Sequence, residues 1–521
     1  MIAQVSLRLT PEQAADPSIV RDAACRAAHT SPARLNALQI IRRSIDARGR
    51  QVMIELTAAV FSENDLPEKT PPVEYPDVHG KREIVIVGSG PAGMFAALKA
   101  IERGYRPIVL ERGKDVRSRR RDIKALCIDH LVNDDSNYCF GEGGAGTYSD
   151  GKLYTRSKKR GDVGGILARL VQHGASEEII TDARPHIGTD KLPTVVENIR
   201  RRIVQAGGDY IFGARVTDLT VRGGRICGVE TASGDKYAAD AVILATGHSA
   251  RDIYELLHRK GIEMQAKGTA IGVRLEHPQD LIDRIQYGQT GRGQYLPAAA
   301  YRVVAQSGGR GVYSFCMCPG GYIMPCATAQ GQVVVNGMSP SSRNGHKANS
   351  GMVVSVEPQD IPPCYAKYGL MALMNFIKDV ENRAWIAGGR TQAAPAARMT
   401  DFCERKISSA LNDTTYIPGI VPAHLDEVLG GFIAPRLREG LKAFGQKMRG
   451  FYTSEATLIG VETRTSSPLR IPRHPVTLSH PRVNGLFPAG EGAGYAGGIV
   501  SAAIDGENCA LAAIEYLENG L

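Results

Sequence analysis

The sequence lacks the segments that would place a protein in or across a membrane. No run of about 18 apolar residues occurs, so we expect no membrane-spanning helix. The first residues, MIAQVSLRLTPEQAADPS, do not combine a charged start with an apolar core, which argues against a signal peptide. We therefore predict a soluble, cytoplasmic protein.

Metal-binding patterns are also missing. The ten cysteines include no repeated CxxC pair and no Cys/His cluster with the spacing of a zinc site. We predict no metal site, and we expect reduced thiols in the cytoplasm. A chain of 521 residues can bury cores large enough to fold without either kind of cross-link.

Aromatic residues are scarce, at 6%, whereas glycine is abundant, with 58 residues. Glycine in this number suggests tight turns and close backbone approaches, as nucleotide-binding loops require. The net charge is +9, and a cluster of cations contributes to it. We interpret the cluster as a solvent-exposed face, with a patch for nucleic acid or an acidic substrate as the alternative; it comprises Arg112, Lys114, Arg117, Arg119, Arg120 and Arg121.

The chain divides into three predicted parts, which together indicate a multidomain α/β and α+β protein. Residues 1–75 form a small α+β domain plus linker, with strands Ile2–Leu9 and Gln51–Val60 and helices Pro17–Ala28 and Pro32–Asp46. The proline-rich segment Ser62–Gly80 is the linker. Residues 81–267 and 444–521 form a doubly wound, Rossmann-like domain, and residues 268–443 form an inserted α+β substrate or cap domain.

A dinucleotide-binding fingerprint opens the second part. The strand Glu83–Val87 leads into a GxGxxG turn, the helix Met94–Arg103, the strand Pro107–Leu110 and a terminal acid. The glycines permit a tight turn and close approach of the pyrophosphate, and the acid is placed to bind ribose hydroxyls. The expected cofactor contacts are Gly88, Gly90, Pro91, Ala92, Gly93, Glu111 and Arg112.

Two distant segments favour FAD over NAD. The strand that ends in Ala245-Thr246-Gly247 is similar to the second signature of two-dinucleotide-binding flavoproteins of the glutathione reductase type. The segment from Val483 to Gly506 resembles their C-terminal motif, in which a helix begins under the flavin and its dipole stabilises negative charge on the reduced ring. The further cofactor contacts we expect are Val216, Ala245, Thr246, Gly247, Gly490, Glu491, Gly497, Gly498 and Ile499.

Longer strings resemble those of bacterial proteins known as uncharacterised FAD-dependent dehydrogenases. The strings are NYCFGEGGAGTYSDGKL from Asn137, FCMCPGG from Phe315, NGMS from Asn336 and GVETRTSSP from Gly460. The resemblance implies an FAD-binding domain, a small N-terminal α+β domain, a separate substrate-side domain and oxidoreductase activity. It does not imply a substrate.

The glycine-rich string from Gly141 is expected near the flavin ring or the pyrophosphate, with Gly144 and Ser149 as cofactor contacts and Asp150 and Lys152 as further polar groups. Cys316 and Cys318 would lie on one face of an extended segment. They are candidates for a redox relay, for packing in a tight segment, or for substrate contact without thiol chemistry.

Two further residues complete the list of catalytic candidates, and the catalytic residues otherwise remain unknown. His248 follows the Ala-Thr-Gly signature directly and is a candidate general acid, or a hydrogen-bonded structural histidine. Arg464 either binds an anionic substrate or pairs with Glu462.

The sequence thus predicts an FAD-dependent oxidoreductase that transfers hydride between a small-molecule substrate and flavin N5. The alternatives are a flavin-dependent RNA-modifying enzyme and a non-catalytic flavin-binding interaction protein. No second GxGxxG follows a strand, so NAD(P)H or another electron donor would dock without a dedicated domain. Nucleic acid is a disfavoured partner, and the oligomeric state stays open.

Overall fold

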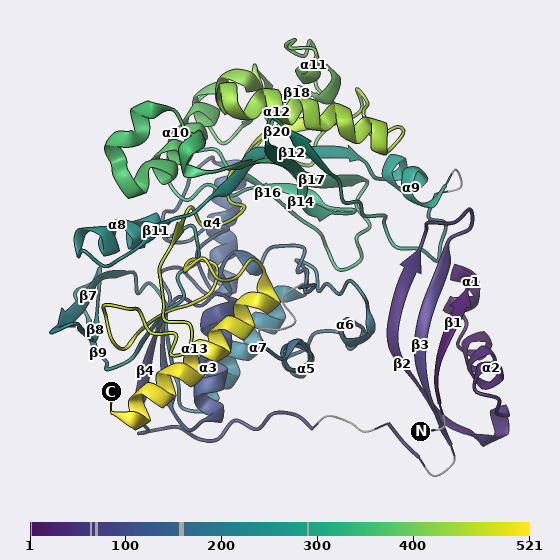
Figure 1. The fold of residues 1–521 in the computed structure, drawn as a ribbon, viewed down its shortest axis with the longest axis horizontal. Helices are drawn as coiled ribbons and strands as arrows, with labels where there is room; N and C mark the ends of the chain where they lie inside the picture. Colours follow the sequence, from purple (N-terminus) through teal and green to yellow (C-terminus); the bar gives the residue numbers. More distant parts are fainter. Residues whose placement is uncertain (2, 63–64, 68–70, 156–160, 289–290, 521) are drawn as a thin grey trace.

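A five-stranded parallel sheet organises the part of the chain that begins near Lys81 (Figure 1). The computed structural model describes residues 1–521 except 2, 63–64, 68–70, 156–160, 289–290 and 521. The strand order is β22-β10-β4-β5-β6, and every neighbouring pair is parallel. The strands are β4 (Glu83–Val87), β5 (Arg106–Leu110), β6 (Asp209–Ile211), β10 (Val242–Leu244) and β22 (Leu486–Pro488).

Different elements cover the two faces of this sheet. One face packs against helices whose apolar residues share a buried cluster, namely α3 (Pro91–Glu102), α5 (Val163–Gln172), α7 (Leu192–Gln205) and α13 (Ile499–Asn519). The other face packs against α8 and an antiparallel three-stranded sheet, in a cluster formed by α8 (Arg251–Arg259), β7 (Val216–Arg222), β8 (Arg225–Thr231) and β9 (Lys236–Ala238). The predicted doubly wound domain is confirmed, including its first strand and helix.

A seven-stranded sheet forms the second large part, in the order β13-β14-β17-β12-β20-β18-β19. Its strands are β12 (Thr269–Pro278), β13 (Val304–Ser307), β14 (Arg310–Cys318), β17 (Lys347–Val356), β18 (Ala394–Arg398), β19 (Ile420–Pro422) and β20 (Thr457–Glu462). Helices α10 (Ala372–Ala387) and α12 (Leu425–Lys447) bury its outer face. The domain built on the five-stranded parallel sheet lies on the opposite side and is called the FAD-type fold below, after the cofactor that its sequence predicts (Figure 1).

The predicted boundary between residues 443 and 444 is wrong. Helix α12 runs through this point, and β20 pairs with both β12 and β18. The chain therefore leaves the seven-stranded sheet only after Glu462, because the edge of β12 would otherwise lack a partner.

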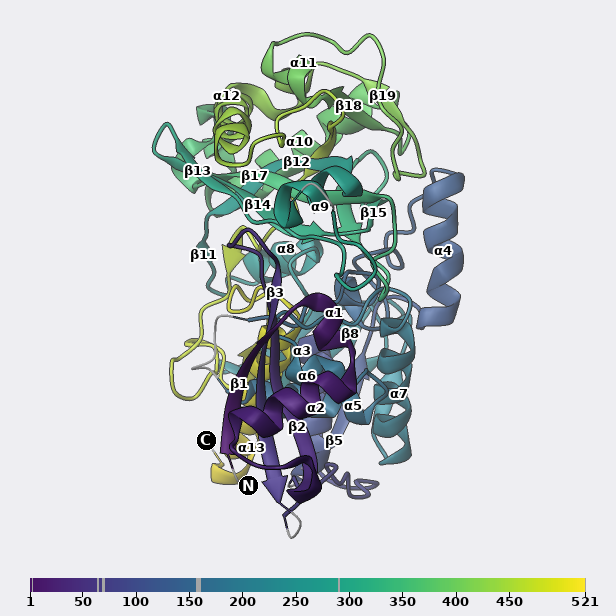
Figure 2. The ribbon, with the colours of Figure 1, turned by 90° about the vertical axis from the view of Figure 1, so that its right-hand side faces the viewer.

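The N-terminal part is a three-stranded antiparallel sheet with two helices on one face (Figure 2). It contains β1 (Ala3–Leu9), α1 (Pro11–Ala15), α2 (Pro17–Ala27), β2 (Leu35–Asp46) and β3 (Met53–Ser62). The predicted helix over 32–46 is wrong, because these residues form β2 after a short 3₁₀ turn and pair along most of β3. The strand predicted from Ile2 is present from Ala3, and Ile2 lies outside the described residues.

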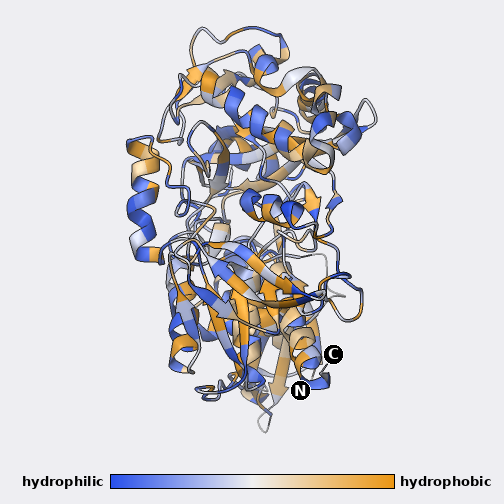
Figure 3. Ribbon diagram, turned by 90° about the vertical axis from the view of Figure 1, so that its left-hand side faces the viewer, coloured by the Kyte–Doolittle hydropathy of each residue, from blue (hydrophilic) through white to orange (hydrophobic). Residues whose placement is uncertain are grey.

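The remaining elements connect these parts or lie at their edges. Apart from Ser62, which ends β3, the described residues of the predicted linker contain no helix or strand. Helix α4 (Val116–Ile128) lies along the outside of the molecule (Figures 2 and 3). Smaller elements are α6 (Glu178–Thr181), α9 (Gln279–Tyr287), α11 (Met399–Cys403), the pairs β11 (Gln265–Ala266) with β21 (Leu469–Arg470) and β15 (Tyr322–Pro325) with β16 (Val335–Met338), and 3₁₀ turns at Pro32–Arg34, Gly144–Gly146, Pro358–Asp360 and Pro363–Met371.

Hydropathy follows these layers. Hydrophobic colours mark the interior strands, while the peripheral helices carry hydrophilic residues on their outer sides (Figure 3). Among the described residues, no helix combines the length and the apolar character needed to cross a bilayer.

The packing of α12 on the seven-stranded sheet predicts the effect of a single side chain. A Cβ at Gly440 would overlap the side chain of Val312 on β14. We expect Gly440→Val to lower the free energy of unfolding by about 1–3 kcal/mol, through overpacking. Urea denaturation followed by circular dichroism measures this change. The matched control is Gly431→Ala on the exposed side of α12, where nothing lies within 4 Å of the added methyl group. Equal stability of the two variants would contradict the packing.

Candidate functional site

The GxGxxG turn between β4 and α3 is built from glycines that have different local surroundings. Gly88 has φ of 100°, and a Cβ there would lie 2.5 Å from the carbonyl oxygen of Ala245. A Cβ at Gly93 would overlap the carbonyl oxygen of Gly88. Gly90, in contrast, faces open space, with nothing within 4 Å of an added Cβ. The first and third glycines thus allow close packing, while the second leaves room in front of the helix.

Helix α3 begins at this open space without a side-chain cap. Its N-cap is Gly90, so no side chain accepts hydrogen bonds from the first free N–H groups. These groups and the positive end of the helix dipole favour an anionic ligand such as a pyrophosphate.

The loop that contains the predicted glycine-rich string folds against the same turn. The amide of Gly143 donates a hydrogen bond to the carbonyl of Ser89 at 3.0 Å, and a Cβ at Gly144 would lie 3.1 Å from Cα of Gly90. The 3₁₀ turn Gly144–Gly146 lies at this contact. The expectation that this string lies beside the pyrophosphate turn is therefore consistent with its position.

Gly146 lies between the first residues of two helices that are far apart in the sequence. A Cβ at this position would be 3.5 Å from Pro91, the first residue of α3, and 3.5 Å from Ile499, the first residue of α13. Helix α13 also begins without a side-chain cap, after Gly497 and Gly498, which have nothing within 4 Å of an added Cβ. Two uncapped helix N-termini therefore lie on either side of one glycine.

Arg119 holds this loop in place and was missed as a site residue. Its side chain is fully buried and donates to four backbone carbonyls, those of Asn137 (2.6 Å), Tyr138 (2.7 Å), Glu142 (2.9 Å) and Gly144 (3.0 Å). The sequence had placed it in a solvent-exposed cluster of cations. That interpretation is wrong for Arg119, although neighbouring Arg117, Arg120 and Arg121 are exposed.

Glu111 ends β5 beside this turn and is buried. Its carboxylate accepts hydrogen bonds from the amide and hydroxyl of Ser89 (3.0 and 2.7 Å) and from the amides of Gly113 (2.9 Å) and Gly141 (3.0 Å). Four donors match the four lone-pair sites of a carboxylate. Glu111 thus ties the turn to the loop, and a ribose hydroxyl would have to share one of these positions.

Three other predicted cofactor contacts, Arg112, Val216 and Ser149, already pack against or bond to other residues of the protein. Arg112 bonds Asp135 (2.8 Å) and Asp252 (3.0 Å) and stacks over Phe140, with 4.1 Å between the guanidinium carbon and the ring centre. Val216 is buried in the apolar cluster beneath β7 and β8. Ser149 donates from its hydroxyl to the carbonyl of Gly146 and accepts from the amide of Gly151.

The Ala-Thr-Gly signature and the C-terminal motif lie next to each other. A Cβ at Gly492 would be 2.6 Å from the carbonyl oxygen of Gly247, and Nδ1 of His248 lies 3.6 Å from a carboxylate oxygen of Glu491. On the other side, Gly490 packs against Ala92 of α3, within 2.9 Å of an added Cβ. The Nε2 atom of His248 is buried and has no hydrogen-bond partner within the described residues.

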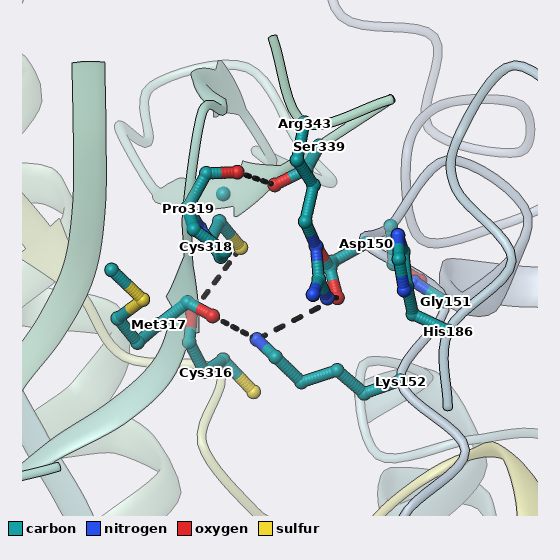
Figure 4. Close-up of polar contacts among 12 residues, drawn as sticks. Asp150, Gly151, Lys152, His186, Cys316, Met317, Cys318, Pro319, Ser339 and Arg343 are labelled. Carbon is teal, nitrogen blue, oxygen red and sulfur yellow. Dashed lines mark hydrogen bonds and ion pairs between the residues drawn. The ribbon is translucent and has the colours of Figure 1, made fainter. Parts of the chain in front are cut away.

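The two cysteines of β14 differ in exposure, although they share the side of the strand that an extended segment predicts for them. Strand β14 shifts register against β17 between Phe315 and Cys318, and Cys316 has φ of 42°. This bulge exposes Cys316 and buries Cys318, whose thiol donates to the carbonyl of Cys316 at 3.3 Å. Both sulfur atoms lie on the side of β14 that faces Lys152, while the side chain of Met317 points to the other side (Figure 4).

One of the two alternatives for Arg464, a pair with Glu462, is wrong. Glu462 pairs with Arg274 at 2.8 Å, and both are fully buried. Arg464 instead bonds Glu381 of α10 at 3.1 Å, and Glu381 also accepts two hydrogen bonds from Arg251 of α8, at 2.7 and 2.8 Å. Glu381 therefore joins the seven-stranded sheet to the FAD-type fold.

The residues around the GxGxxG turn and the start of α13 fit an FAD molecule. Open space lies in front of Gly90, Gly247, Gly497 and Gly498, and two uncapped helix N-termini lie nearby. The unpartnered Nε2 of His248 lies in the same region, between the two remaining signatures. A long, flat, doubly charged dinucleotide requires this combination of backbone donors and missing side chains.

Comparison with known sequences agrees with this geometry. A family model for a FAD-dependent protein, C-terminal domain-like, matches residues 268–465; an FAD binding domain matches residues 83–121, and a domain of unknown function matches residues 1–61. An uncharacterised protein of Clostridium beijerinckii is 39% identical over 525 residues, covering 96% of this chain and 97% of that protein. The FixC protein of Escherichia coli (strain K12) is 28% identical over 219 residues, covering 39% of this chain and 46% of FixC.

Solved structures resemble the chain more distantly. A geranylgeranyl bacteriochlorophyll reductase-like protein from Thermoplasma acidophilum has a TM-score of 0.36 and 13% sequence identity, covering 85% of this chain and 80% of that one. The protein CtdE in complex with FAD has a TM-score of 0.32 and 13% identity, covering 83% of this chain and 84% of that one.

The buried position of Glu381 predicts a pH-dependent contribution to stability. Burial alone would raise the pKa of Glu381, but Arg251 and Arg464 lower it to about 2. Glu381→Gln leaves two guanidinium groups without a counter-charge, and we expect it to lower the free energy of unfolding by about 3–5 kcal/mol. Because the folded-state pKa lies below the usual 4.5, this difference should be complete above pH 5 and shrink as the pH falls from about 4.5 towards 2.

Thermal unfolding of both proteins across this pH range measures the effect. Glu404→Gln, which removes an exposed carboxylate paired with Lys406, is the control and should change little at any pH. A Glu381→Gln deficit that does not shrink at low pH would contradict the assignment of an ionised Glu381.

Proposed function

The chain belongs to an uncharacterised family of FAD-dependent proteins, and we propose that it is an oxidoreductase that transfers hydride between a small-molecule substrate and bound FAD. The observation that carries the proposal is the meeting of α3, the glycine-rich loop and α13 at Gly146. Gly146 lies more than 50 residues after the start of α3 and more than 350 residues before the start of α13. In this proposal, each of the three segments would contribute a part of one dinucleotide site.

We assign the two ends of FAD to different elements. The free amides at the start of α3, after Gly90, would bind the pyrophosphate, and Glu111 lies where the adenosine ribose is expected. The start of α13 after Gly498 would lie near the ring system, where its positive dipole end favours an electron-rich reduced ring. When bound, FAD supplies the hydride chemistry at N5.

The seven-stranded sheet would supply the substrate side. The sheet face opposite α10 and α12 is turned towards the FAD-type fold, and β14 presents Cys316 there on its bulge (Figures 1 and 4). Buried pairs fix this arrangement, because Glu381 links the two parts and Arg274 donates to the carbonyl of Cys316 at 2.6 Å. In this proposal, the chain's own residues would orient a substrate against the ring.

A substitution in the turn tests the cofactor assignment. Gly90 has an ordinary φ of −70° and nothing within 4 Å of an added Cβ, so Gly90→Glu should fold normally. Its carboxylate would occupy the space of the pyrophosphate and repel it, so we expect a colourless protein. Visible absorbance and released FAD measure occupancy, and circular dichroism measures folding.

Gly431→Glu is the matched control, since it adds the same side chain at an exposed glycine remote from the turn. It should remain yellow. A Gly90→Glu protein with a full complement of FAD would remove the proposed pyrophosphate position.

Anaerobic stopped-flow reduction of the holoprotein tests the activity itself. We expect loss of the oxidised flavin absorbance with at least one donor from a panel of NADH, NADPH and small metabolites, followed by reoxidation with an electron acceptor. A flavin that dithionite reduces but that no member of a broad panel reduces or reoxidises would favour a binding protein without catalysis.

A further inference from the structure

Lys152 reaches from the FAD-type fold to the seven-stranded sheet (Figure 4). It follows the glycine-rich loop in the sequence, and its ammonium group donates a hydrogen bond to the carbonyl of Met317 in the bulge of β14. The side chain remains 39% exposed, so a dissolved molecule can contact it. Lys152 therefore lies at an accessible point where both large parts of the protein meet.

The charges around Lys152 do not balance. The nearest carboxylate is Asp150, 3.9 Å away, and Arg343 already occupies both of its oxygens at 2.6 and 3.1 Å. Burial and the neighbouring Arg343 lower the pKa of His186, so this imidazole is neutral at pH 7. Two cations thus share one carboxylate, and the exposed cation of the two is Lys152.

The thiol of Cys316 adds a second group at the same point. Its sulfur lies on the same side of the β14 bulge as the Lys152 ammonium (Figure 4), and Cys316 is exposed whereas Cys318 is buried. The residue is exposed, but the protein packed around its thiol removes water from it, and this desolvation raises the pKa of Cys316 to about 11. The charges of Lys152 and Arg274 oppose the shift. The group therefore remains an S–H donor at neutral pH.

The charged groups behind the bulge of β14 do not cancel the excess positive charge around Lys152. Arg274 and Glu462 form a buried pair of opposite charge, and Arg274 holds the carbonyl of Cys316 rather than its thiol. An exposed ammonium and a weak S–H donor then face solvent together, which is the combination that an anionic oxygen group requires.

We propose that Lys152 and Cys316 bind the carboxylate of an organic-acid substrate. The ammonium of Lys152 supplies the charge, and the thiol of Cys316 donates to a carboxylate oxygen without being oxidised. A neutral amide of the same shape would lack the ionic attraction. That this carboxylate belongs to the redox substrate rests on the function proposed above, whereas binding of the carboxylate itself does not require turnover.

Alkylation of Cys316 in the oxidised holoprotein tests the site. Iodoacetamide is added at pH 9, and peptide mass spectrometry follows Cys316 together with Cys364, an exposed thiol on another surface that serves as an internal reference. The probes are acetate, propionate and benzoate, each compared with its own amide at equal ionic strength. At about ten times its dissociation constant, a bound carboxylate should slow alkylation of Cys316 about tenfold, by mass action.

Variants at Lys152 separate charge from shape. We expect Lys152→Met to abolish the protection by carboxylates, and also to slow the basal alkylation of Cys316, because the ammonium favours its thiolate. Lys152→Arg should retain protection. Lys124→Met, which removes an exposed lysine of α4, should behave as the wild type. Flavin absorbance is measured for every variant, so that protection is compared at equal FAD content.

Two outcomes would overturn the site. Equal protection by carboxylates and amides, or by neither, would show that no anion is recognised. Undiminished protection in Lys152→Met would show that the ammonium is not its ligand. If carboxylates protect Cys316 but no donor ever reduces the flavin, the anion site stands and the proposed oxidoreductase function fails.

Discussion

The close packing of α13 against α3 is the constraint on which the rest of the structure depends. A Cβ at Gly506 would overlap the carbonyl of Ala92, so the last long helix lies directly against the first turn of the fingerprint helix. This contact brings both helix N-termini to Gly146 and places β22 beside β10 in the parallel sheet. Without the contact between α13 and α3, the fingerprint would be an isolated βαβ unit, and the start of α13 would not lie beside it.

Buried ion pairs, together with apolar clusters that span both parts, fix the seven-stranded sheet relative to this scaffold. Glu381 takes hydrogen bonds from arginines of two different parts, and Arg274 connects β12, β20 and the bulge of β14. Burying such pairs costs desolvation free energy, but their directional hydrogen bonds fix the relative positions of the elements that they join. These fixed positions matter where a loop from one part, carrying Lys152, has to meet a single carbonyl of the other.

Local patterns predicted the fingerprint well, because β4, its turn and α3 follow each other within 20 residues and each residue type has a local reason. Segments whose structure depends on distant partners were harder to predict. Residues 35–46 form a strand because β3 pairs with them, and β20 belongs to the larger sheet because β12 needs a neighbour. The bulge at Cys316 depends on pairing with residues 349–351 of β17. The burial of Arg119 depends on the backbone carbonyls of residues 137–144. The spacing of residues in the sequence reveals neither partner.

The place of β22 and α13 in the FAD-type fold also has a consequence for biosynthesis. The ribosome completes the fingerprint, the glycine-rich loop and the entire seven-stranded sheet before it reaches residues 486–519. The nascent chain can therefore form its largest sheet early, while the nucleotide cradle stays open on one side. The side of the cradle that α13 forms can therefore close around a nucleotide only after residues 486–519 have been synthesised.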